Sequence, residues 1–315
     1  QTLAWGGFGA QALAMQDESD GGIATRQLGR TGERVPIVGL GGYHIGVPEE
    51  KEAISIMHEA IDQGMTFFDN AWDYHDGGSE EVMGKALSTG GRRDKVFLMT
   101  KVCDRDYQGA KRHLDDSLRR LKTDRIDLWQ FHEINWDVDA EWVFEKGGIK
   151  AAIEARRQGK VRYIGFTGHR DPSHHLKMID RDFDWDSVQM PINLLDAHYR
   201  SFQKDVLPVC REKNISVIGM KALGGGRIPD DLQIPAEACR RFALSLPIAT
   251  LVCGIQSRAN LQQDLELART FKPISQTEMK RLLAETKVPG SDGKLEPWKT
   301  TNYGGRHHRE QHAES

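Results

Sequence analysis

The feature that most constrains the fold is an alternation of short apolar runs with longer segments of helical period. From residue 25 to about residue 269, runs rich in Val, Ile, Leu, Phe and Met are separated by segments whose apolar residues recur every three to four positions. The eight runs are Val35–Leu40, Thr66–Asp69, Val96–Lys101, Ile126–His132, Tyr163–Thr167, Ser187–Met190, Ser216–Met220 and Thr250–Gly254. Eight such strand–helix units predict an α/β fold of the (β/α)8 TIM barrel class.

The segments that flank these units carry further signals. Residues Gln27–Val35 place a glycine-bearing turn between two extended stretches, which predicts an N-terminal hairpin plug at the bottom of the barrel. A C-terminal extra helix is expected from Ser275 to about Lys287. The alternative of an open doubly wound sheet needs a G-x-G-x-x-G turn after the first strand, and Gly39–Gly42 lacks the third glycine.

Three regions of the chain are therefore expected. Residues 25–287 form the barrel, residues 1–24 form a leader or linker, and residues 288–315 form a C-terminal tail. The leader contains Thr2–Ala14, an apolar segment whose last residues fit a signal-peptidase site. It is interpreted either as the remnant of an export signal or as a chain start unrelated to export.

The tail is expected to consist of two parts. Its aromatic residues Trp298 and Tyr303 are expected to fold back and form part of the substrate pocket. Its end, Gly304–Ser315, is polar and is expected to be disordered. The histidines in this end leave a metal-binding tract as the less favoured alternative to a solvated tail.

Charge and composition exclude several classes of function. The 43 Lys and Arg residues nearly balance 46 Asp and Glu, so the chain lacks the strongly basic character of a nucleic-acid-binding domain. The sequence contains no run of about 18 apolar residues long enough to cross a membrane. Its four cysteines form no C-x-x-C pair, which argues against a cysteine-based metal cluster or a disulfide framework. We expect an enzyme with a small-molecule substrate, no nucleic-acid or membrane partner and no metal; the oligomeric state stays open.

Polar side chains stand where the second, third and fourth strands are expected to end. Asp69 ends the second strand, with Tyr74 five residues on, and Lys101 and His132 end the next two. Because the carboxyl ends of barrel strands carry the active site, these four side chains are expected to converge. Each one alone has an ordinary structural interpretation, such as helix capping or loop packing. The combination carries the prediction.

The four side chains together suit proton transfer to a carbonyl oxygen. A free phenol has a pKa of about 10, and an adjacent ammonium lowers it. Lys101 is therefore expected to lower the pKa of Tyr74, while Asp69 keeps Lys101 protonated and oriented. His132 is expected to donate to the carbonyl oxygen or to complete a proton relay with Tyr74. Since no side chain supplies a hydride, reduction of the carbonyl implies a nicotinamide cofactor.

The region 25–287 resembles the aldo-keto reductase family. Arg26–Gly32 is similar to the opening of the family, and Phe67–Ala71 followed by Tyr74 is similar to its second-strand motif. The resemblance implies an NADP-dependent oxidoreductase of the (β/α)8 fold. Its expected activity is the reversible reduction of an aldehyde or ketone to an alcohol.

The resemblance also assigns roles to the four polar side chains. Lys101 and His132 fall where the family places the remaining members of its catalytic tetrad. It implies that Tyr74 is the general acid/base, that Asp69 and Lys101 tune it, and that His132 orients the substrate carbonyl. A cofactor-binding regulatory or scaffold protein with residual reductase activity remains the alternative.

The cofactor implied by the resemblance is NADP(H), with NAD(H) as the alternative. The residues expected to bind it are Thr167, His169, Gln189, Met220, Lys221, Leu223, Gly225, Gln256, Ser257, Arg258, Asn260, Gln263 and Asp264. The chain departs from the family pattern at Gly168, where an Asn is usual, and His169 is expected to act in its place. Ser257 and Arg258 near a helix N-terminus suit a 2′-phosphate, although a basic position of one family branch falls on Gly254.

The substrate can be described only by class. Tyr43, Trp72 and Trp136 are expected to wall the site, which suits a ring-containing or partly apolar carbonyl compound. A metal-dependent hydrolase on the same barrel is a poor alternative, because Tyr43-His44-Ile45 does not supply the H-x-H of its first strand. Dependence on NADPH favours a cytoplasmic location, with export to the periplasm as the alternative.

Overall fold

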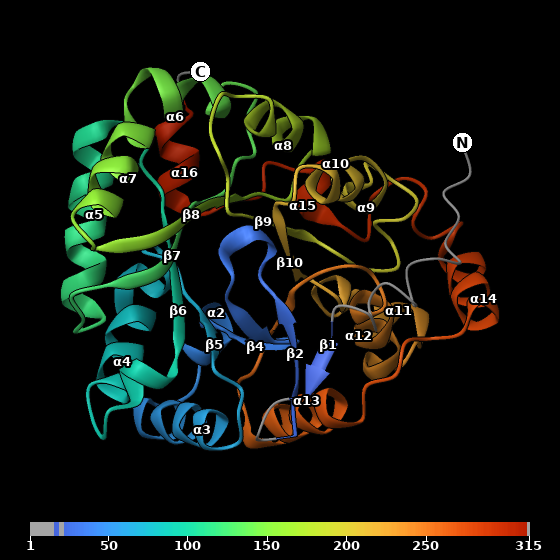
Figure 1. The fold of residues 1–315 in the computed structure, drawn as a ribbon. Coiled ribbons are helices and arrows are strands. Elements are labelled where there is room, and N and C mark those ends of the chain that lie inside the picture. The colour runs from blue at the N-terminus through green and yellow to red at the C-terminus, as the bar shows by residue number, and fades with distance from the viewer. Residues whose placement is uncertain (1–15, 19–21, 314–315) are drawn as a thin grey trace.

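A closed barrel of eight parallel strands forms the centre of the molecule (Figure 1). The computed structural model describes residues 16–18 and 22–313. The barrel strands are β4 (Val38–Gly41), β5 (Phe67–Asp69), β6 (Phe97–Val102), β7 (Ile126–Phe131), β8 (Val161–Thr167), β9 (Ser187–Pro191), β10 (Ser216–Met220) and β11 (Thr250–Cys253). Each pairs in parallel with its neighbours in chain order, and β11 closes the ring on β4. Each of the eight predicted runs overlaps one of these strands, although the first run also includes Val35 of the hairpin, and the predicted barrel is confirmed.

A ring of helices surrounds the barrel and buries the outer faces of its strands (Figure 1). The longer helices are α3 (Glu50–Asp62), α4 (Gly78–Leu87), α5 (Tyr107–Arg120), α7 (Gly148–Arg157), α8 (Pro172–Ile179), α12 (Ala236–Leu244) and α13 (Arg258–Thr270). Shorter helices are α2 (Gly42–Ile45), α6 (Asp139–Glu145), α9 (Phe202–Asp205), α10 (Leu207–Glu212) and α11 (Arg227–Leu232). The described residues also contain the 3-10 turns η2 (Gly29–Thr31), η3 (Tyr74–Gly77), η4 (Arg92–Lys95) and η5 (Gly224–Gly226).

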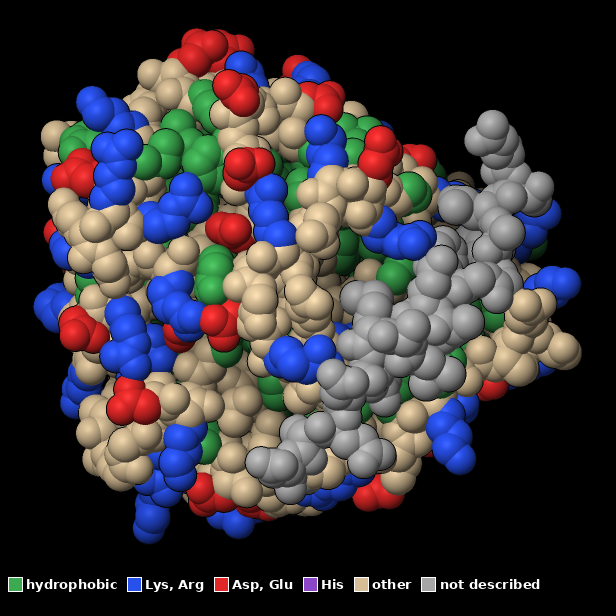
Figure 2. All heavy atoms as spheres, viewed as in Figure 1, with side chains coloured by type: hydrophobic (Ala, Val, Ile, Leu, Met, Phe, Trp, Pro, Cys, Tyr) green, Lys and Arg blue, Asp and Glu red, His purple; other side chains and the backbone are tan. Residues whose placement is uncertain are grey.

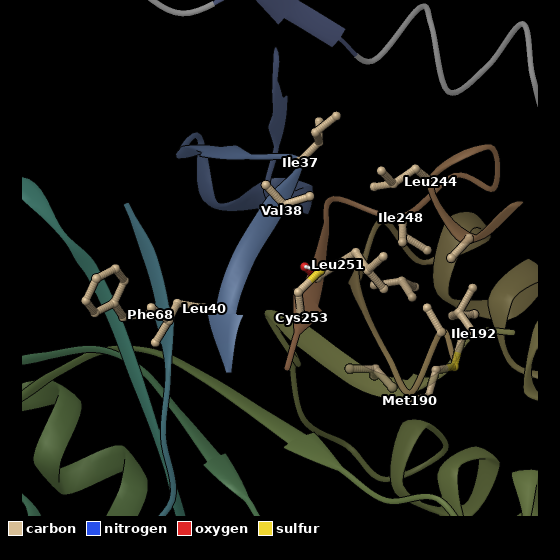
Figure 3. Packing of buried hydrophobic residues seen from close by; sticks show 14 of the residues in the cluster. Ile37, Val38, Leu40, Phe68, Met190, Ile192, Leu244, Ile248, Leu251 and Cys253 are labelled. Atoms are coloured by element: carbon tan, nitrogen blue, oxygen red, sulfur yellow. Dashed lines mark hydrogen bonds between the residues drawn. The ribbon is translucent and has the colours of Figure 1, made fainter. Parts of the chain in front are cut away.

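The alternation of side chains along the strands separates two apolar layers. Phe67 points into the barrel, while its neighbour Phe68 belongs to the layer between strands and helices. Figure 3 shows this outer layer at Leu40 and Phe68 on one side and at Leu244 and Leu251 on the other. Both layers are closed to water, so the strand ends are held rigidly.

The N-terminal hairpin plugs the bottom of the barrel, as predicted. Strands β2 (Ala24–Gln27) and β3 (Arg34–Pro36) pair antiparallel, and β1 (Gln16–Glu18) adds to β2. Leu28 and Val35 from the hairpin are fully buried against the barrel interior. Arg26 is also fully buried and donates to the carbonyl oxygens of Leu244 (2.8 Å) and Ile248 (2.9 Å). These bonds tie the hairpin to the end of α12.

The C-terminal segment differs from expectation. The predicted extra helix is present as α14 (Gln276–Thr286), and two short helices follow, α15 (Pro297–Thr300) and α16 (Arg306–Gln311). The prediction that the end of the tail is disordered is wrong for residues 304–313. The contacts that hold these residues in place are polar and aromatic, because His308 and His312 are buried among carboxylates and aromatic rings. Apolar periodicity could not have indicated them.

Thr2–Ala14, the candidate remnant of an export signal, lies outside the described residues, whereas residues 16–18 of the expected linker form β1. Among the described residues, no helix is long and apolar enough to span a membrane. Positive and negative side chains are interspersed over the face in Figure 2, in line with the nearly balanced charge.

Candidate active site

The carboxyl ends of the barrel strands surround a cavity of about 830 Å³. Its wall includes the last residues of β4, β5, β8, β10 and β11. The residues expected at the site that line this cavity are Tyr43, Asp69, Trp72, Tyr74, Lys101, His132, Thr167, His169, Gln189, Met220, Lys221, Leu223, Gly225, Gln256 and Asn260. The structure thus brings most of the predicted site into one place.

Asp69, Lys101 and Tyr74 form a connected group at the ends of β5 and β6. The Lys101 side chain is 1% exposed, and its Nζ donates to Asp69 Oδ1 and to the Asn70 carbonyl oxygen (2.7 Å). The same Nζ lies 3.4 Å from the Tyr74 hydroxyl oxygen. Because three acceptors fix the ammonium, it stands beside the phenol in one defined position.

The pKa of Tyr74 is shifted in the direction opposite to the expected one. Burial raises the pKa of the phenol well above its usual value of 10.0, and the carboxylates of Asp69, Asp73 and Glu133 add to this effect. Lys101 does not reverse the shift, because Asp69 largely compensates its charge. The surroundings of Tyr74 therefore favour the protonated phenol, which is the form that can donate a proton.

His132 extends from the end of β7 with its two ring nitrogens in different surroundings. Its Nδ1 lies 3.0 Å from Asp73 Oδ1 and 3.4 Å from His308 Nε2. Its ring stands edge-on to Tyr74, with 5.5 Å between the ring centroids. Burial alone would raise the pKa of Asp73, but His132 and His308 outweigh it and hold that pKa far below its usual range. Because Nδ1 is engaged on this side, Nε2 is the nitrogen left for a ligand.

The cavity wall also carries polar groups that lack hydrogen-bond or ion-pair partners among the described residues. Gln189 Oε1 is buried without a hydrogen-bond partner, while Gln189 Nε2 lies 3.5 Å from Asp69 Oδ2. Among the described residues, no carboxylate lies within ion-pair distance of Lys221 Nζ, which stands over the rings of Trp298 (4.9 Å) and Tyr303 (5.3 Å). An amide oxygen and an ammonium directed into one cavity suit a ligand that carries both a donor and an anion.

Comparison with known proteins decides the family. The family model described as "Aldo/keto reductase family" matches residues 37–241. The chain belongs to the aldo/keto reductase family. The chain is also 36% identical over 224 residues to "Uncharacterized oxidoreductase YrpG" of Bacillus subtilis, covering 63% of this chain and 66% of that relative.

Further relatives and solved structures agree with this assignment. "Aldo-keto reductase yakc [NADP(+)]" of Schizosaccharomyces pombe is 29% identical over 268 residues, 76% of each chain. "Methylglyoxal reductase YeaE" of Escherichia coli is 31% identical over 208 residues, 63% of this chain and 68% of that one. An aldo-keto reductase of Bacillus halodurans superposes with a TM-score of 0.68 at 24% identity, covering 90% of this chain and 99% of that chain. A Klebsiella pneumoniae aldo/keto reductase in complex with NADP and acetate gives 0.69 at 24% identity, covering 82% and 94%. The solved structures support the fold.

Five residues predicted for the site of this aldo/keto reductase do not line the cavity. Ser257 caps α13 by accepting from the Asn260 N–H (3.2 Å), and Arg258 donates to Glu52 (3.2 Å) and Ser55 (2.7 Å) on α3. The remaining three are Gln263, Asp264 and Trp136. Gln263 is exposed on α13.

Asp264 and Trp136 each make a defined contact with another side chain. Asp264 is buried and pairs with Arg240 Nε at 2.8 Å, and burial raises the pKa of its carboxyl to about 6. Arg240 itself lines the cavity, so Asp264 positions a wall residue. Trp136 stacks on His312 with 4.1 Å between ring centroids, next to the C-terminal end of α16.

Several residues of the cavity wall are not among the predicted site residues. Asp73 and Glu133 each adjoin a predicted residue, so the same search of strand ends could have identified them. Arg240 lies on α12 and had no signal of its own. Glu133 accepts from the Gly305 N–H (3.0 Å), which brings the start of α16 against the cavity. This contact joins positions 172 residues apart and could not be read from a local pattern.

Proposed function

We propose that this aldo/keto reductase reduces an aldehyde or ketone to an alcohol, reversibly, with NADP(H) as cofactor. The observation that carries the proposal is the group of Asp69, Tyr74, Lys101 and His132 on the wall of one cavity. The nicotinamide, when bound, supplies the hydride to the carbonyl carbon.

The side chains of the chain supply the proton and hold the substrate. The Tyr74 hydroxyl donates its proton to the carbonyl oxygen as negative charge develops there. Lys101, fixed by Asp69, stabilises that charge from 3.4 Å behind the phenol oxygen. His132 presents Nε2 to the same carbonyl oxygen and orients it. In the reverse direction Tyr74 accepts the proton of the alcohol.

The cavity fits the expected cofactor. The unpartnered Gln189 Oε1 can accept from a carboxamide N–H, with Thr167 and His169 at the end of β8 nearby. Met220 offers an apolar surface to the nicotinamide ring. Lys221 can pair with the pyrophosphate, a role supported by the absence of a carboxylate partner among the described residues.

The remaining predicted residues belong to the adenosine end of the proposed site. Leu223 and Gly225 offer backbone close to the phosphates, and Gln256 and Asn260 line the end of the cavity beyond β11. We propose that Ser257 and Arg258 receive the 2′-phosphate at the start of α13, with Gln263 and Asp264 supporting this end. The relative yakc carries NADP(+) in its name, and the Klebsiella pneumoniae structure contains NADP.

A ring-containing or partly apolar carbonyl compound is the proposed substrate class. Tyr43, Trp72 and Tyr303 contribute aromatic surface to the cavity. The carboxylates of Asp73 and Glu133 stand on the same wall and can accept from substrate hydroxyl groups. A ring with both apolar faces and polar substituents would use both features.

Replacement of the phenol tests the proposal. For wild type and Tyr74→Phe, NADPH binding is measured by fluorescence titration. Turnover is then measured on a panel of sugars, quinones and ring ketones. Tyr74→Phe should bind NADPH as wild type does and lose about 10²–10⁴-fold in rate. Tyr163→Phe removes a phenol near the hairpin plug and should keep the wild-type rate. Turnover by Tyr74→Phe at the wild-type rate would contradict the proposed mechanism.

A further inference from the structure

Four metal-ligating side chains from four separate parts of the chain meet beside Tyr74. Asp73 follows β5, Cys103 follows β6, His132 follows β7, and His308 comes from α16. One donor atom from each lies within 4.8 Å of the donor atoms of the others. Around His132 Nδ1, Asp73 Oδ1 is at 3.0 Å, His308 Nε2 at 3.4 Å and Cys103 Sγ at 3.8 Å.

We propose that Asp73, Cys103, His132 and His308 form a binding site for a divalent transition metal of the zinc class. A tetrahedral zinc ion with bonds of about 2.0–2.3 Å separates its donor atoms by about 3.3–3.8 Å. The separations around His132 Nδ1 are close to this range. One thiolate and two imidazoles select zinc-like ions over magnesium or calcium, which prefer oxygen donors.

Because these four polar groups are buried, leaving them without a cation costs free energy. The side chains of Cys103 and His308 are fully buried, and those of His132 and Asp73 are 7% and 13% exposed. The His132 and His308 nitrogens that face each other cannot both carry a proton without repulsion, and a single proton on His132 Nδ1 serves only one of its three neighbours. A metal ion would satisfy all four groups at once. On binding, the Cys103 S–H bond breaks, the sulfur bonds to the metal and the proton leaves to solvent.

A second cluster, which shares helix α16 with the first, does not meet these conditions. It consists of Asp104, His113 and His307. His113 Nδ1 accepts from the Cys103 backbone N–H (3.3 Å), so the ring proton sits on Nε2, which faces Asp104 Oδ2 at 3.4 Å. A protonated nitrogen cannot bind a metal. His307 is 34% exposed, and its Nε2 already lies 2.7 Å from Asp104 Oδ1. His307 therefore provides a matched control, because it is an adjacent histidine outside the proposed ligand set.

The proposed metal would act on both the tail and the site. It would join α16 to the ends of three strand segments by bonds stronger than hydrogen bonds. Metal on Nδ1 of His132 also leaves the ring proton on Nε2, which is the donor that the carbonyl needs. This second effect rests on the proposed reductase function, whereas the metal site itself does not.

Cobalt substitution tests the ligand set directly. Protein prepared without an affinity tag is treated with a chelator and titrated with Co²⁺, a spectroscopic substitute for Zn²⁺. Wild type should bind one ion per chain, with tetrahedral visible bands and a thiolate-to-cobalt charge-transfer band in the near ultraviolet. Cys103→Ser should lose the charge-transfer band. His308→Ala should weaken binding at least about 100-fold, while His307→Ala stays within about twofold of wild type.

The outcomes separate this inference from the reductase proposal. Absence of the charge-transfer band in wild type at one equivalent of Co²⁺ would overturn the site, whatever the enzyme activity. Equal loss of affinity in His307→Ala and His308→Ala would also overturn it, because the tail would then bind metal nonspecifically. Tyr74→Phe should bind Co²⁺ as wild type does. A wild-type protein that binds Co²⁺ as described but reduces no carbonyl would contradict only the reductase function.

Discussion

The phenol of Tyr74 shows how strongly a single residue depends on groups that a local pattern does not reveal. Its position near Lys101 follows from the order of strands, but its pKa depends on burial and on the carboxylates of Asp69, Asp73 and Glu133. The sequence predicts Lys101 beside the phenol but not the carboxylates of Asp73 and Glu133. The direction of the pKa shift was therefore predicted wrongly, although the residue itself was placed on the cavity wall as expected.

Arg258 carries a prediction about cofactor choice. Its guanidinium donates to Glu52 and Ser55 and remains 55% exposed, so it can turn towards a phosphate at the start of α13. If it receives the 2′-phosphate, Arg258→Ala should raise the Kd for NADPH about tenfold and leave the Kd for NADH unchanged. Fluorescence titration with both cofactors measures the difference.

The control for this measurement lies on the same helix. Arg269, at the far end of α13, donates to Gln63 (3.0 Å), and Arg269→Ala should change neither Kd. Equal weakening of NADPH and NADH in Arg258→Ala would refute the phosphate role and indicate a general effect on the helix.

Helix α16 is the element whose stability rests on polar and aromatic contacts instead of an apolar face. His312 Nε2 lies 2.9 Å from Asp139 Oδ1, and the His312 ring stacks on Trp136 and Trp142. Gly305 donates to Glu133 at the other end of the helix. These contacts join the tail to α6 and β7, and Figure 1 shows α16 beside α6.

Removal of one contact should loosen this helix measurably. His312→Ala should cost about 1–3 kcal/mol of docking free energy, because it removes the hydrogen bond to Asp139 and the stacking on Trp136. Trypsin should then cleave after the arginines of α16 faster than in wild type. Glu310→Ala changes an exposed residue of the same helix and should leave cleavage unchanged. Equal cleavage rates in wild type and His312→Ala would show that His312 does not hold the helix.

The contrast between the barrel and α16 explains what the sequence can predict. The barrel strands are encoded by contiguous apolar residues such as those of Val96–Lys101, so each can be recognised locally. The polar side chains at strand ends follow from the same pattern, which places Asp69 and Lys101 on the cavity wall. Contacts of the tail depend on pairs such as His308 with His132, 176 residues apart, and neither partner is apolar. No local period encodes such pairs.

At the scale of the whole molecule, buried neutral histidines link stability to pH. His175 on α8 is fully buried, its Nε2 lies 3.4 Å from the Gln189 carbonyl oxygen, and burial lowers its pKa from 6.5 to about 3. The unfolded chain therefore binds a proton between these two values that the folded chain does not. The stability that this residue contributes is complete above about pH 7 and decreases as the pH falls towards 3.

A substitution isolates the contribution of this residue. Between pH 7 and pH 5, His175 should reduce the free energy of unfolding by about 2 kcal/mol. His175→Gln keeps a polar amide near the Gln189 carbonyl and removes the titration, so its Tm and urea midpoint should depend less on pH over this range. A pH dependence identical to that of wild type would contradict the buried, neutral state of His175.

The position of α16 has a consequence for the order in which the protein is made. All eight barrel strands precede residue 254, whereas the cavity wall is completed by Tyr303 and residues 304–307. Since a chain emerges from the ribosome N-terminus first, the barrel can close while this wall is still absent. In a nascent chain whose barrel has already closed, this side of the cavity is therefore open, and the wall is complete only once these late residues have been synthesised.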